Sequence, residues 1–554
     1  MIKDVHVTGQ DNRVRKYLAP KAILYTQGQV FHIDALLKRQ EFQISTSEPH
    51  CTVLKNEGGP NAAFLLDFGM EFAGGIRLAV ETCTGEATPV LRLRFGESVG
   101  EAMSDVGQNG SSNDHSPRDF EVKTTSFSDL EFGQTGFRFV RIDLLSPKTS
   151  VRLKAVTGVF TYRNIEYKGS FRCSDPLLNT IYDVAAYTCH LNMQHMLWDG
   201  IKRDRLVWIG DIHPEMLTIR TVFGEDRCIE EGLDYAIKKA PLPDYPNGMV
   251  TYAMWWLLIC RDWYFTTGRD TFIQEHAAYI RALLLQLCEL VDENGADRLA
   301  QYPTGYFLDW PTFEKEDAKA GVRALFSLAL RAGAELCEHI DCHELAGQCR
   351  KYAALLTTKA FPALAKASVA MMALAGHMDS ANAAERLLKD GTAGFSTFMS
   401  YYILTALARS GHTAEALDLL KNYYGGMLAA GATTFWEDFS LDWYRDGSRI
   451  DTLIPPGGYD IHRDNGAFCY TGYRHSLCHG WSSAPTAFLA EQVLGITFAE
   501  PGGRRVRIQP CLGALEYAEG TFPTPFGIIA VHHSRQTDGS IRSDIKLPDG
   551  ILSI

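Results

Sequence analysis

Three aspartates stand close together in a polar stretch between residues 199 and 215. Asp199, Asp204 and Asp211 are five and then seven residues apart, with arginines and tryptophans between them. A turn or two of backbone could direct all three carboxylates into one cleft, and burying so many charges is costly unless they are paired. This stretch therefore predicts a polar pocket. The plainer alternative is a loop followed by a helix, with Asp211 as the N-cap before Ile212.

Tryptophans adjoin carboxylates at several other points in the middle of the chain. Asp309-Trp310 and Trp436-Glu437 are two such pairs. Aromatic rings stack on the apolar faces of sugars, while carboxylates accept hydrogen bonds from hydroxyl groups. The combination is typical of a carbohydrate site. Each pair also has a structural alternative, since Asp309 could brace a turn and Trp436 could anchor a loop.

Hydrolysis of a glycosidic bond would suit these residues. It needs a carboxylic acid that protonates the leaving oxygen and a carboxylate that attacks or activates water. Glu437 is the best partner for the aspartates, because it follows Trp436 shortly after a turn at Gly431.

Two other chemistries have weaker support. Residues 96–100, Gly-Glu-Ser-Val-Gly, match the nucleophile elbow of serine hydrolases, but a Gly- and Ser-rich loop rather than a helix is expected after them. Cys337, His339, Cys342 and His343 lack the spacing of a structural zinc site. We therefore predict no metal and no cofactor, and leave open a calcium ion in a loop.

The elements that position these residues fall into three regions. Short alternating apolar runs predict an N-terminal β-sandwich at residues 1–167, with a long loop at 97–119 that could reach a neighbouring domain. About a dozen helical segments follow, many of them joined by short turns, and six hairpins are enough to close an (α/α)6 toroid at residues 168–494. Strand patterns return at residues 495–554 and predict a small C-terminal β-sandwich.

Composition excludes several classes of partner. A hydrophobic content of 46% is ample for large cores, and a net charge of −12 argues against nucleic acid. The longest apolar stretch, 252–260, is too short to cross a membrane. Thirteen scattered cysteines and the absence of a signal-peptide pattern at the start favour a soluble, cytoplasmic protein with reduced thiols. A homo-oligomer stays open.

Four motifs make the sequence resemble the α-L-rhamnosidases of glycoside hydrolase family seventy-eight. They are Asp67-Phe-Gly-Met-Glu-Phe-Ala-Gly, the signature from Asp199 to Asp211, Ala432-Thr-Thr-Phe-Trp-Glu437, and Cys478-His-Gly-Trp481. The resemblance implies an inverting hydrolase that releases terminal L-rhamnose, with a six-hairpin (α/α)6 barrel between β-domains.

The resemblance also implies residue roles. The position of the family's general acid is occupied by Asp204, and that of its general base by Glu437. Independently of the resemblance, we expect Arg203 or Arg205 to balance the acidic charge. The residues that the resemblance implies hold the sugar are Asp199, Trp208, Asp211 and His479 and, by a looser match in spacing, Trp256 and Trp310.

The sequence departs from the family at the acid, which is usually a glutamate. Aspartate is one methylene shorter, so its carboxyl would fall roughly 1.5 Å short on an unchanged backbone. Glu215 is the second candidate for the acid, although it is more plausible as a first-turn helix residue. The chain is also short for the family, which favours a small oligosaccharide or glycoside as substrate.

Two alternatives remain at this point. A related toroid hydrolase or lyase could act on another deoxy sugar or on a uronic acid, with Lys202, Arg203 and Arg205 as a cationic clamp. A catalytically inactive sugar-binding homologue is the second alternative, because the change at Asp204 permits it.

Overall fold

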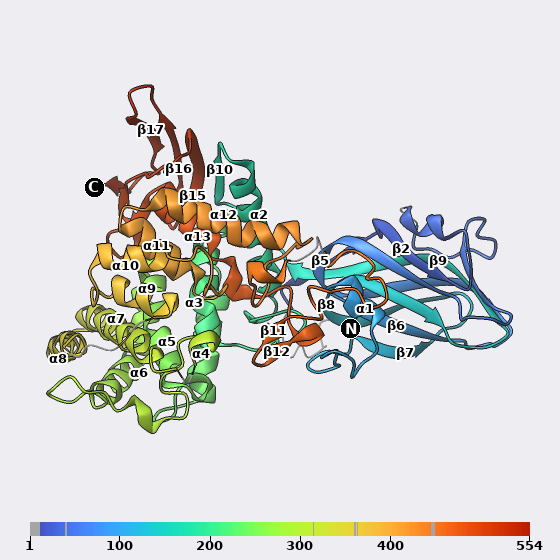
Figure 1. Ribbon diagram of the computed structural model, residues 1–554, viewed down its shortest axis with the longest axis horizontal. Coiled ribbons are helices and arrows are strands. Elements are labelled where there is room, and N and C mark those ends of the chain that lie inside the picture. Colours follow the sequence, from blue (N-terminus) through green and yellow to red (C-terminus); the bar gives the residue numbers. More distant parts are fainter. Residues whose placement is uncertain (1–10, 39–40, 314, 359–361, 363, 445–448) are drawn as a thin grey trace, which may run out of the picture.

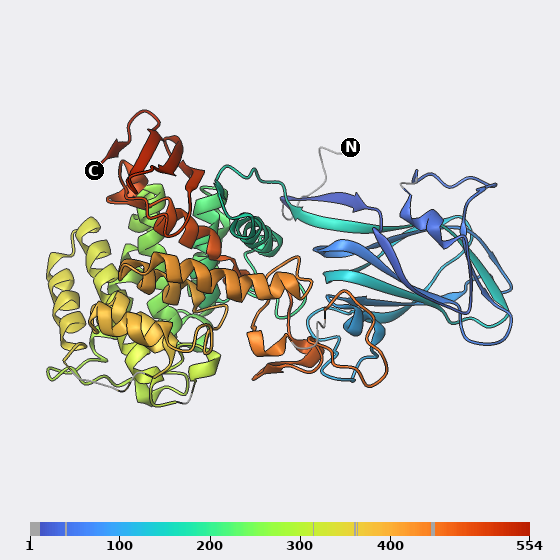
Figure 2. The ribbon, with the colours of Figure 1, turned by 45° about the horizontal axis from the view of Figure 1, so that its top comes forward.

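The computed structural model describes residues 11–38, 41–313, 315–358, 362, 364–444 and 449–554. A domain rich in strands lies at one end and a helical domain at the other (Figure 1). In both views the C-terminal strands lie against the helical domain (Figures 1 and 2). No helix among the described residues has both the length and the apolar character needed to cross a membrane.

The described part of the N-terminal domain contains nine strands that pair antiparallel throughout. Seven of them follow the order β3-β4-β9-β5-β8-β6-β7, while β1 pairs with β9 and β2 with β5. Alternate side chains, such as Phe64, Leu66, Phe137 and Leu153, are buried in one core. The strands are β1 (Arg13–Leu18), β2 (Ala22–Gln27), β3 (Gln29–Phe31), β4 (Thr52–Asn56), β5 (Ala63–Thr84), β6 (Val90–Gly96), β7 (Asp119–Lys123), β8 (Ser128–Leu144) and β9 (Thr149–Arg163).

The helical domain confirms the predicted six-hairpin toroid. The described residues contain twelve helices, α2 to α13. Each odd-numbered helix from α3 packs against the next odd-numbered one, and α13 packs against α3, so these six helices close a ring. These inner helices are α3 (Ile209–Val222), α5 (Val250–Thr267), α7 (Ala318–His339), α9 (Lys366–Leu374), α11 (Ser400–Arg409) and α13 (Pro485–Phe488). The outer helices are α2 (Pro176–Asn192), α4 (Cys228–Lys239), α6 (Asp270–Cys288), α8 (His343–Leu355), α10 (Ser380–Leu388) and α12 (Thr413–Ala429).

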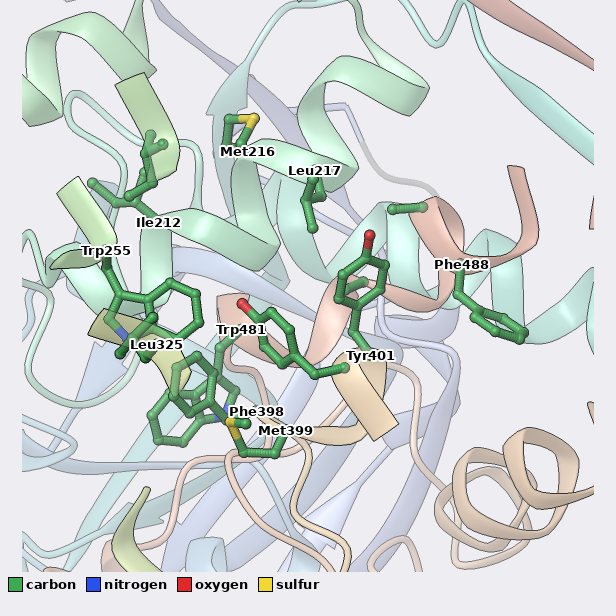
Figure 3. Close-up of a cluster of buried hydrophobic side chains, with 14 of the residues drawn as sticks. Ile212, Met216, Leu217, Trp255, Leu325, Phe398, Met399, Tyr401, Trp481 and Phe488 are labelled. Atoms are coloured by element: carbon green, nitrogen blue, oxygen red, sulfur yellow. The ribbon is translucent and has the colours of Figure 1, made fainter. Parts of the chain in front are cut away.

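Side-chain distribution explains which helices lie inside. Helix α5 is buried on almost every face, as expected for an inner helix, whereas α4 buries one stripe and exposes the other. Figure 3 shows part of the core of the helical domain, in which Trp255 of α5 and Leu325 of α7 lie beside Phe398 and Trp481. The ring of Phe398 is 5.9 Å from that of Trp255 and 5.0 Å from that of Trp481, so the aromatic side chains of the core pack directly on one another.

The C-terminal strands form two small sheets. The four-stranded sheet β10-β15-β16-β17 includes β10, which precedes the first helix of the toroid, and the other sheet is β13-β14-β18. The C-terminal unit is therefore joined to the helical domain by backbone hydrogen bonds. Its strands are β10 (Ser170–Cys173), β13 (Ile496–Phe498), β14 (Arg505–Ile508), β15 (Tyr517–Thr524), β16 (Gly527–Arg535), β17 (Ile541–Lys546) and β18 (Leu552–Ser553).

Two local predictions are wrong. Helix α3 begins at Ile209 rather than near Glu215, so Pro214 lies inside it and leaves one backbone carbonyl of the first turn without its usual donor. A short helix, α1 (Val99–Met103), begins within the Gly-Glu-Ser-Val-Gly segment, where only a loop was expected, because Ser98 caps it by accepting the Glu101 N–H at 3.1 Å.

Candidate active site

A cavity of about 180 Å³ lies at the mouth of the toroid. It is smaller than the roughly 300–1,000 Å³ typical of pockets for drug-sized ligands, so it suits one small ring. Eight of the predicted site residues line it, namely Asp199, Arg203, Asp204, Trp208, Asp211, Trp310, Glu437 and His479.

The connection from α2 to α3 supplies the acidic side of the cavity. Asp199 folds this segment on itself, since its backbone N–H donates to the Leu206 carbonyl and its Oδ1 accepts the Leu206 N–H at 2.9 Å. Asp204 and Arg205 have φ angles of 55° and 58°, in the left-handed region that is rare for residues other than glycine. The tight turn brings Arg203 and Asp204 to the cavity.

Arg203 joins the two predicted catalytic carboxylates. Its Nη1 lies 3.2 Å from Asp204 Oδ1, and its Nη2 donates to Glu437 Oε1. Because one planar guanidinium holds both groups, the facing carboxylate oxygens lie within roughly 8 Å of each other. The turn at 203–205 and the Trp436-Glu437 segment thus meet across the cavity although 234 residues separate Arg203 from Glu437.

Glu437 is buried but ionised. Burial alone would raise its pKa, but the charges of Arg203 and His479 outweigh it and lower the pKa to about 2. The Ser476 N–H donates to Oε2 at 3.3 Å and helps to fix the carboxylate. A carboxylate held in this state can accept a proton at neutral pH.

Asp211 pairs with His479 and does not cap the helix. Trp208 occupies the N-cap of α3, and Asp211 in the first turn accepts from His479 Nε2 at 3.0 Å. Burial raises the pKa of Asp211 and of Asp199. For His479, burial opposes the charged form, but Glu437 and Asp211 raise the pKa. The site therefore holds a buried hydrogen-bonded pair beside the ionised Glu437.

Trp256 was predicted to hold the sugar, but it is not among the cavity-lining residues. It is fully buried between α5 and its neighbours, where the indole N–H donates to the Leu233 carbonyl at 3.4 Å and the ring packs on Tyr279. Tyr252, one turn earlier in α5, lines the cavity instead. The other lining residues that sequence reasoning missed are Met249, Thr304, Phe307, Phe313, Cys469 and Trp481. Of these, Trp481 stood in the Cys478-His-Gly-Trp481 motif, which was the available signal.

Glu215 does not line the cavity. It lies in the second turn of α3, fully buried, and neither carboxylate oxygen has a hydrogen-bond partner among the described residues. A Cβ atom on Gly480 would approach Glu215 Oε1 to 1.6 Å, so this glycine makes room for the side chain. Burial raises the pKa of Glu215 well above its ordinary value. Its position does not support a role as the acid.

The N-terminal domain supports the site through a buried polar network. Lys202 Nζ lies 2.7 Å from Glu97 Oε2 and 3.4 Å from Glu101 Oε1, and it donates to the His475 carbonyl at 2.6 Å. Glu97 also accepts the Leu477 N–H at 2.7 Å. This network, the Lys202 network, therefore fixes the chain leading to His479.

The same network explains two features that resemble other kinds of site. Glu97, Glu101 and His462 could together hold a metal ion, but the Lys202 ammonium already pairs with both carboxylates. Ser98 lies 2.8 Å from His462 Nδ1, which resembles a serine hydrolase pair. Both side chains are buried, so no substrate reaches the serine.

The predicted cationic clamp is not assembled. Lys202 belongs to the buried network, and Arg205 lies over the Trp198 ring at 4.6 Å and donates to the Gln134 carbonyl. Arg203 alone of the three lines the cavity. Four carboxylates accompany it there, so the cavity is acidic overall.

Comparisons with known proteins match the helical and C-terminal regions to models of one family. Residues 166–357 match the model of the bacterial alpha-L-rhamnosidase six-hairpin glycosidase domain, and residues 495–551 match that of the bacterial alpha-L-rhamnosidase C-terminal domain. A curated alpha-L-rhamnosidase of Formosa agariphila is 26% identical over 161 residues, which are 28% of this chain and 16% of that protein. The predicted resemblance is confirmed.

Solved structures show the same fold. A rhamnosidase of family seventy-eight from Bacillus sp. GL1 is 23% identical with a TM-score of 0.75, over 91% of this chain and 54% of that one. A rhamnosidase from Klebsiella oxytoca with rhamnose bound is 19% identical with a TM-score of 0.67, over 86% of this chain and 95% of that one. The chain thus spans about half the length of the Bacillus protein and a sixth of the curated relative.

Proposed function

Because the chain carries the six-hairpin and C-terminal domains of the bacterial α-L-rhamnosidases, we propose that it is an inverting α-L-rhamnosidase acting on a small glycoside or oligosaccharide. The observation that carries this proposal is the pair of carboxylates, Asp204 and Glu437, that face one small aromatic-walled cavity and share Arg203.

In the proposed mechanism Asp204 donates a proton to the glycosidic oxygen, and the bond from that oxygen to the anomeric carbon breaks. Glu437 takes a proton from a water molecule that attacks the opposite face, so the configuration inverts. The low pKa of Glu437 supports its role as the base. The upper limit on the carboxylate separation is compatible with the roughly 6.5–9.5 Å of inverting enzymes.

Asp199, Asp211 and His479 are the proposed hydrogen-bonding partners of the sugar hydroxyls. The aromatic side chains of Trp208, Trp310 and Tyr252 would pack against its apolar faces. A neutral deoxy sugar suits a cavity with four carboxylates better than a uronic acid does, because a sugar carboxylate would be repelled.

Location in the cytoplasm is a further part of the proposal, and the oligomeric state stays open. All thirteen cysteines are free thiols, and Cys288 and Cys349 stay unbonded at 3.9 Å. Such thiols are typical of a reducing compartment. Light scattering on the purified protein measures the oligomeric state.

Hydrolysis of aryl α-L-rhamnosides by three variants tests the function. We expect Glu437→Gln to lower kcat at least about 100-fold for every rhamnoside, and Asp204→Asn to do so for rhamnosides whose leaving group needs protonation, since each removes one proton-transfer group. Glu385→Gln, an exposed change on α10, is the matched control. Proton NMR should show β-L-rhamnose as the first product. A wild-type protein without rhamnosidase activity would overturn the proposal, and α-L-rhamnose as first product would overturn inversion.

A further inference from the structure

The turn that carries the proposed acid packs directly against the N-terminal domain. Gly136 of β8 lies so close to it that a Cβ atom on this glycine would come within 2.5 Å of the Ile201 side chain and 3.0 Å of the Lys202 nitrogen. The absence of a side chain at position 136 lets the two backbones approach each other. Strand β8 and residues 201–205 are therefore in contact across the boundary between the domains.

Two neighbouring residues of the N-terminal domain hydrogen-bond this turn. His115 and Ser116 lie in the connection between α1 and β7. The Asp204 N–H donates to His115 Nδ1 at 2.5 Å, and the buried Ser116 hydroxyl donates to the Lys202 carbonyl at 2.9 Å. These two bonds fix the peptide groups on either side of Arg203. We call His115 and Ser116 the bracket.

The bracket is itself held firmly. Arg118, in the same connection, is buried and donates to the Ser104 carbonyl at 2.8 Å and to the Phe95 carbonyl at 3.1 Å. Thr135 Oγ1 of β8 lies 2.8 Å from Ser116 Oγ, and it is the donor there because the Ser116 proton is directed to the turn. The bracket is thus tied both to its own connection and to β8.

The turn depends on outside support because its backbone conformation is costly. Asp204 and Arg205 have φ angles of 55° and 58°. Such angles are unfavourable for residues with a Cβ atom and persist where the surroundings enforce them. Arg205 is held too, since its Nη1 donates to the Gln134 carbonyl of β8 at 3.0 Å. Without these bonds the turn would relax to a commoner conformation, and the Asp204 carboxyl would move with it.

We propose that His115 and Ser116 are positioning residues that set where the Asp204 carboxyl stands in the cavity. The inference rests on the proposed function, in which Asp204 is the acid. Aspartate has one rotatable side-chain bond fewer than the glutamate usual in the family, so the place of its carboxyl follows the backbone more closely. Asp204 Oδ1 lies 3.0 Å from His115 Nδ1, so the ring stands beside the group that it positions. The N-terminal domain thus acts on proton transfer without lining the cavity.

Two substrates with different leaving groups distinguish positioning of the acid from general support of the fold. His115→Gly removes the acceptor and tolerates the positive φ of 65° at this position, and Ser116→Ala removes the donor. We expect each to lower kcat/KM at least about 10-fold for a methyl rhamnoside, whose leaving group needs the acid. The loss should stay below about threefold for a dinitrophenyl rhamnoside, which leaves without protonation. Ser112→Ala, at a partly exposed serine of the same connection, is the matched control.

His115→Asn tests whether the hydrogen bond is what matters. The side-chain oxygen of asparagine takes about the place of Nδ1 and can accept the same N–H, and asparagine also tolerates a positive φ. We expect His115→Asn to keep kcat/KM for the methyl rhamnoside within about threefold of the wild type. If His115→Asn were as slow as His115→Gly, the inference would be wrong. Equal slowing of both substrates in His115→Gly, or of neither, would also overturn it.

Hydrogen exchange gives a readout that does not depend on activity. Mass spectrometry of overlapping peptides should show the Asp204 amide exchanging at least about 10-fold faster in His115→Gly than in the wild type or in His115→Asn. An unchanged rate in His115→Gly would overturn the inference. A wild type without rhamnosidase activity would overturn the proposed function, while the exchange rates would still decide whether the bracket holds the turn.

Discussion

Arg203 determines the protonation state of Glu437 at the residue scale. Only 3% of the Glu437 surface is exposed, and this burial alone would raise the pKa of its carboxyl above the ordinary value of 4.5. The guanidinium reverses this effect and brings the pKa to about 2. The residue that bridges the two carboxylates thus also keeps one of them ready to accept a proton.

Arg203→Met should therefore shift the acid limb of the pH profile. In the wild type Glu437, with a pKa of about 2, stays ionised and can act as the base at any pH well above that value. Without the arginine, the largest of the charges that oppose the effect of burial is lost, so the acid limb of kcat/KM should move to higher pH. Arg205→Met, which removes the neighbouring arginine, is the control. An acid limb that stays in place in Arg203→Met would contradict this account.

The types of residue in the candidate site were largely predictable from the sequence, but which side chains come close to the cavity was predicted less well. Eight of nine predicted site residues line the cavity, because their types and motifs carry the chemistry. Trp256 and Tyr252 are aromatic residues one turn apart on one helix, and sequence does not say which turn lies at the mouth. The hydrogen bond from the Asp204 N–H to the His115 ring was missed because His115 lies in a loop 89 residues from Asp204. Such contacts depend on how whole domains pack.

At the scale of elements, a buried cap below Trp310 links stability to pH. Asp309 caps the short helix η5 (Trp310–Thr312) by accepting the Trp310 N–H at 2.8 Å, and it also accepts from the Ser396 hydroxyl. The turn-bracing alternative for this residue is therefore confirmed. Burial raises its pKa from 3.8 to about 6, despite these two bonds. The folded state therefore favours the protonated carboxyl.

Asp309→Asn should stabilise the protein at alkaline pH. Because the folded pKa lies above the unfolded one, the stability gained from the proton is full below about pH 3.8 and is lost as pH rises through about 6. Asparagine keeps the capping oxygen without the charge. We expect a gain of at most about 3 kcal/mol at pH 8, falling toward zero at pH 4. Thermal unfolding at pH 4, 6 and 8 measures it, with Asp379→Asn at the exposed cap of α10 as control. A gain that does not depend on pH would argue against the linkage.

The hairpin β11 (Gly466–Ala467) and β12 (Tyr470–Thr471) places an aromatic ring beside the cavity. Phe468 between the two strands is 52% exposed and stacks on Trp310, with ring centroids 5.9 Å apart. Its φ of 57° is unusual for a phenylalanine, so the hairpin holds the ring outward against a conformational cost. An exposed ring next to the pocket suits contact with the aglycone.

Phe468→Ala should raise KM about 3- to 10-fold for rhamnosides with an aromatic aglycone, since a stacked aromatic pair contributes about 0.5–1.5 kcal/mol. KM for a methyl rhamnoside should change little. Phe127→Ala removes an equally exposed phenylalanine of the N-terminal domain and serves as the control. Equal effects on both substrates would show that the ring supports the fold of the hairpin instead.

At the scale of the whole molecule, the candidate site lies near the boundary between the N-terminal and helical domains, although the residues that line the cavity all come from the helical region. The hairpin β11–β12 and α1 lie where the N-terminal and helical domains meet (Figures 1 and 2). The Tyr473 N–H donates to the Asn109 carbonyl there, and the Glu71 N–H donates to the Thr433 hydroxyl across the same boundary. Periodicity predicted the three regions and the long loop at 97–119 that could reach a neighbour. It did not indicate the buried Lys202 network, since Lys202 and Glu97 look like surface residues in isolation.

Lys202→Met tests whether this network holds the domains and the site together. The substitution removes the cation that pairs with both Glu97 and Glu101 and leaves Glu101 only Arg118, at 3.8 Å; breaking a buried ion pair typically costs about 3–5 kcal/mol. We expect a clear fall in Tm together with loss of rhamnosidase activity, because the carbonyl of His475 also loses its donor. Lys238→Met, at an exposed pair on α4, should leave both unchanged.

The loss of stability in Lys202→Met should also depend on pH. Burial without Lys202 favours the uncharged form of the two carboxyls, so lowering the pH protonates them and reduces the unpaired charge. The difference in Tm from the wild type should therefore be larger at pH 8 than at pH 5. If the difference were the same at both pH values, the lost stability would come from packing of the lysine stem, and the ion pairs would contribute little to holding the two domains together.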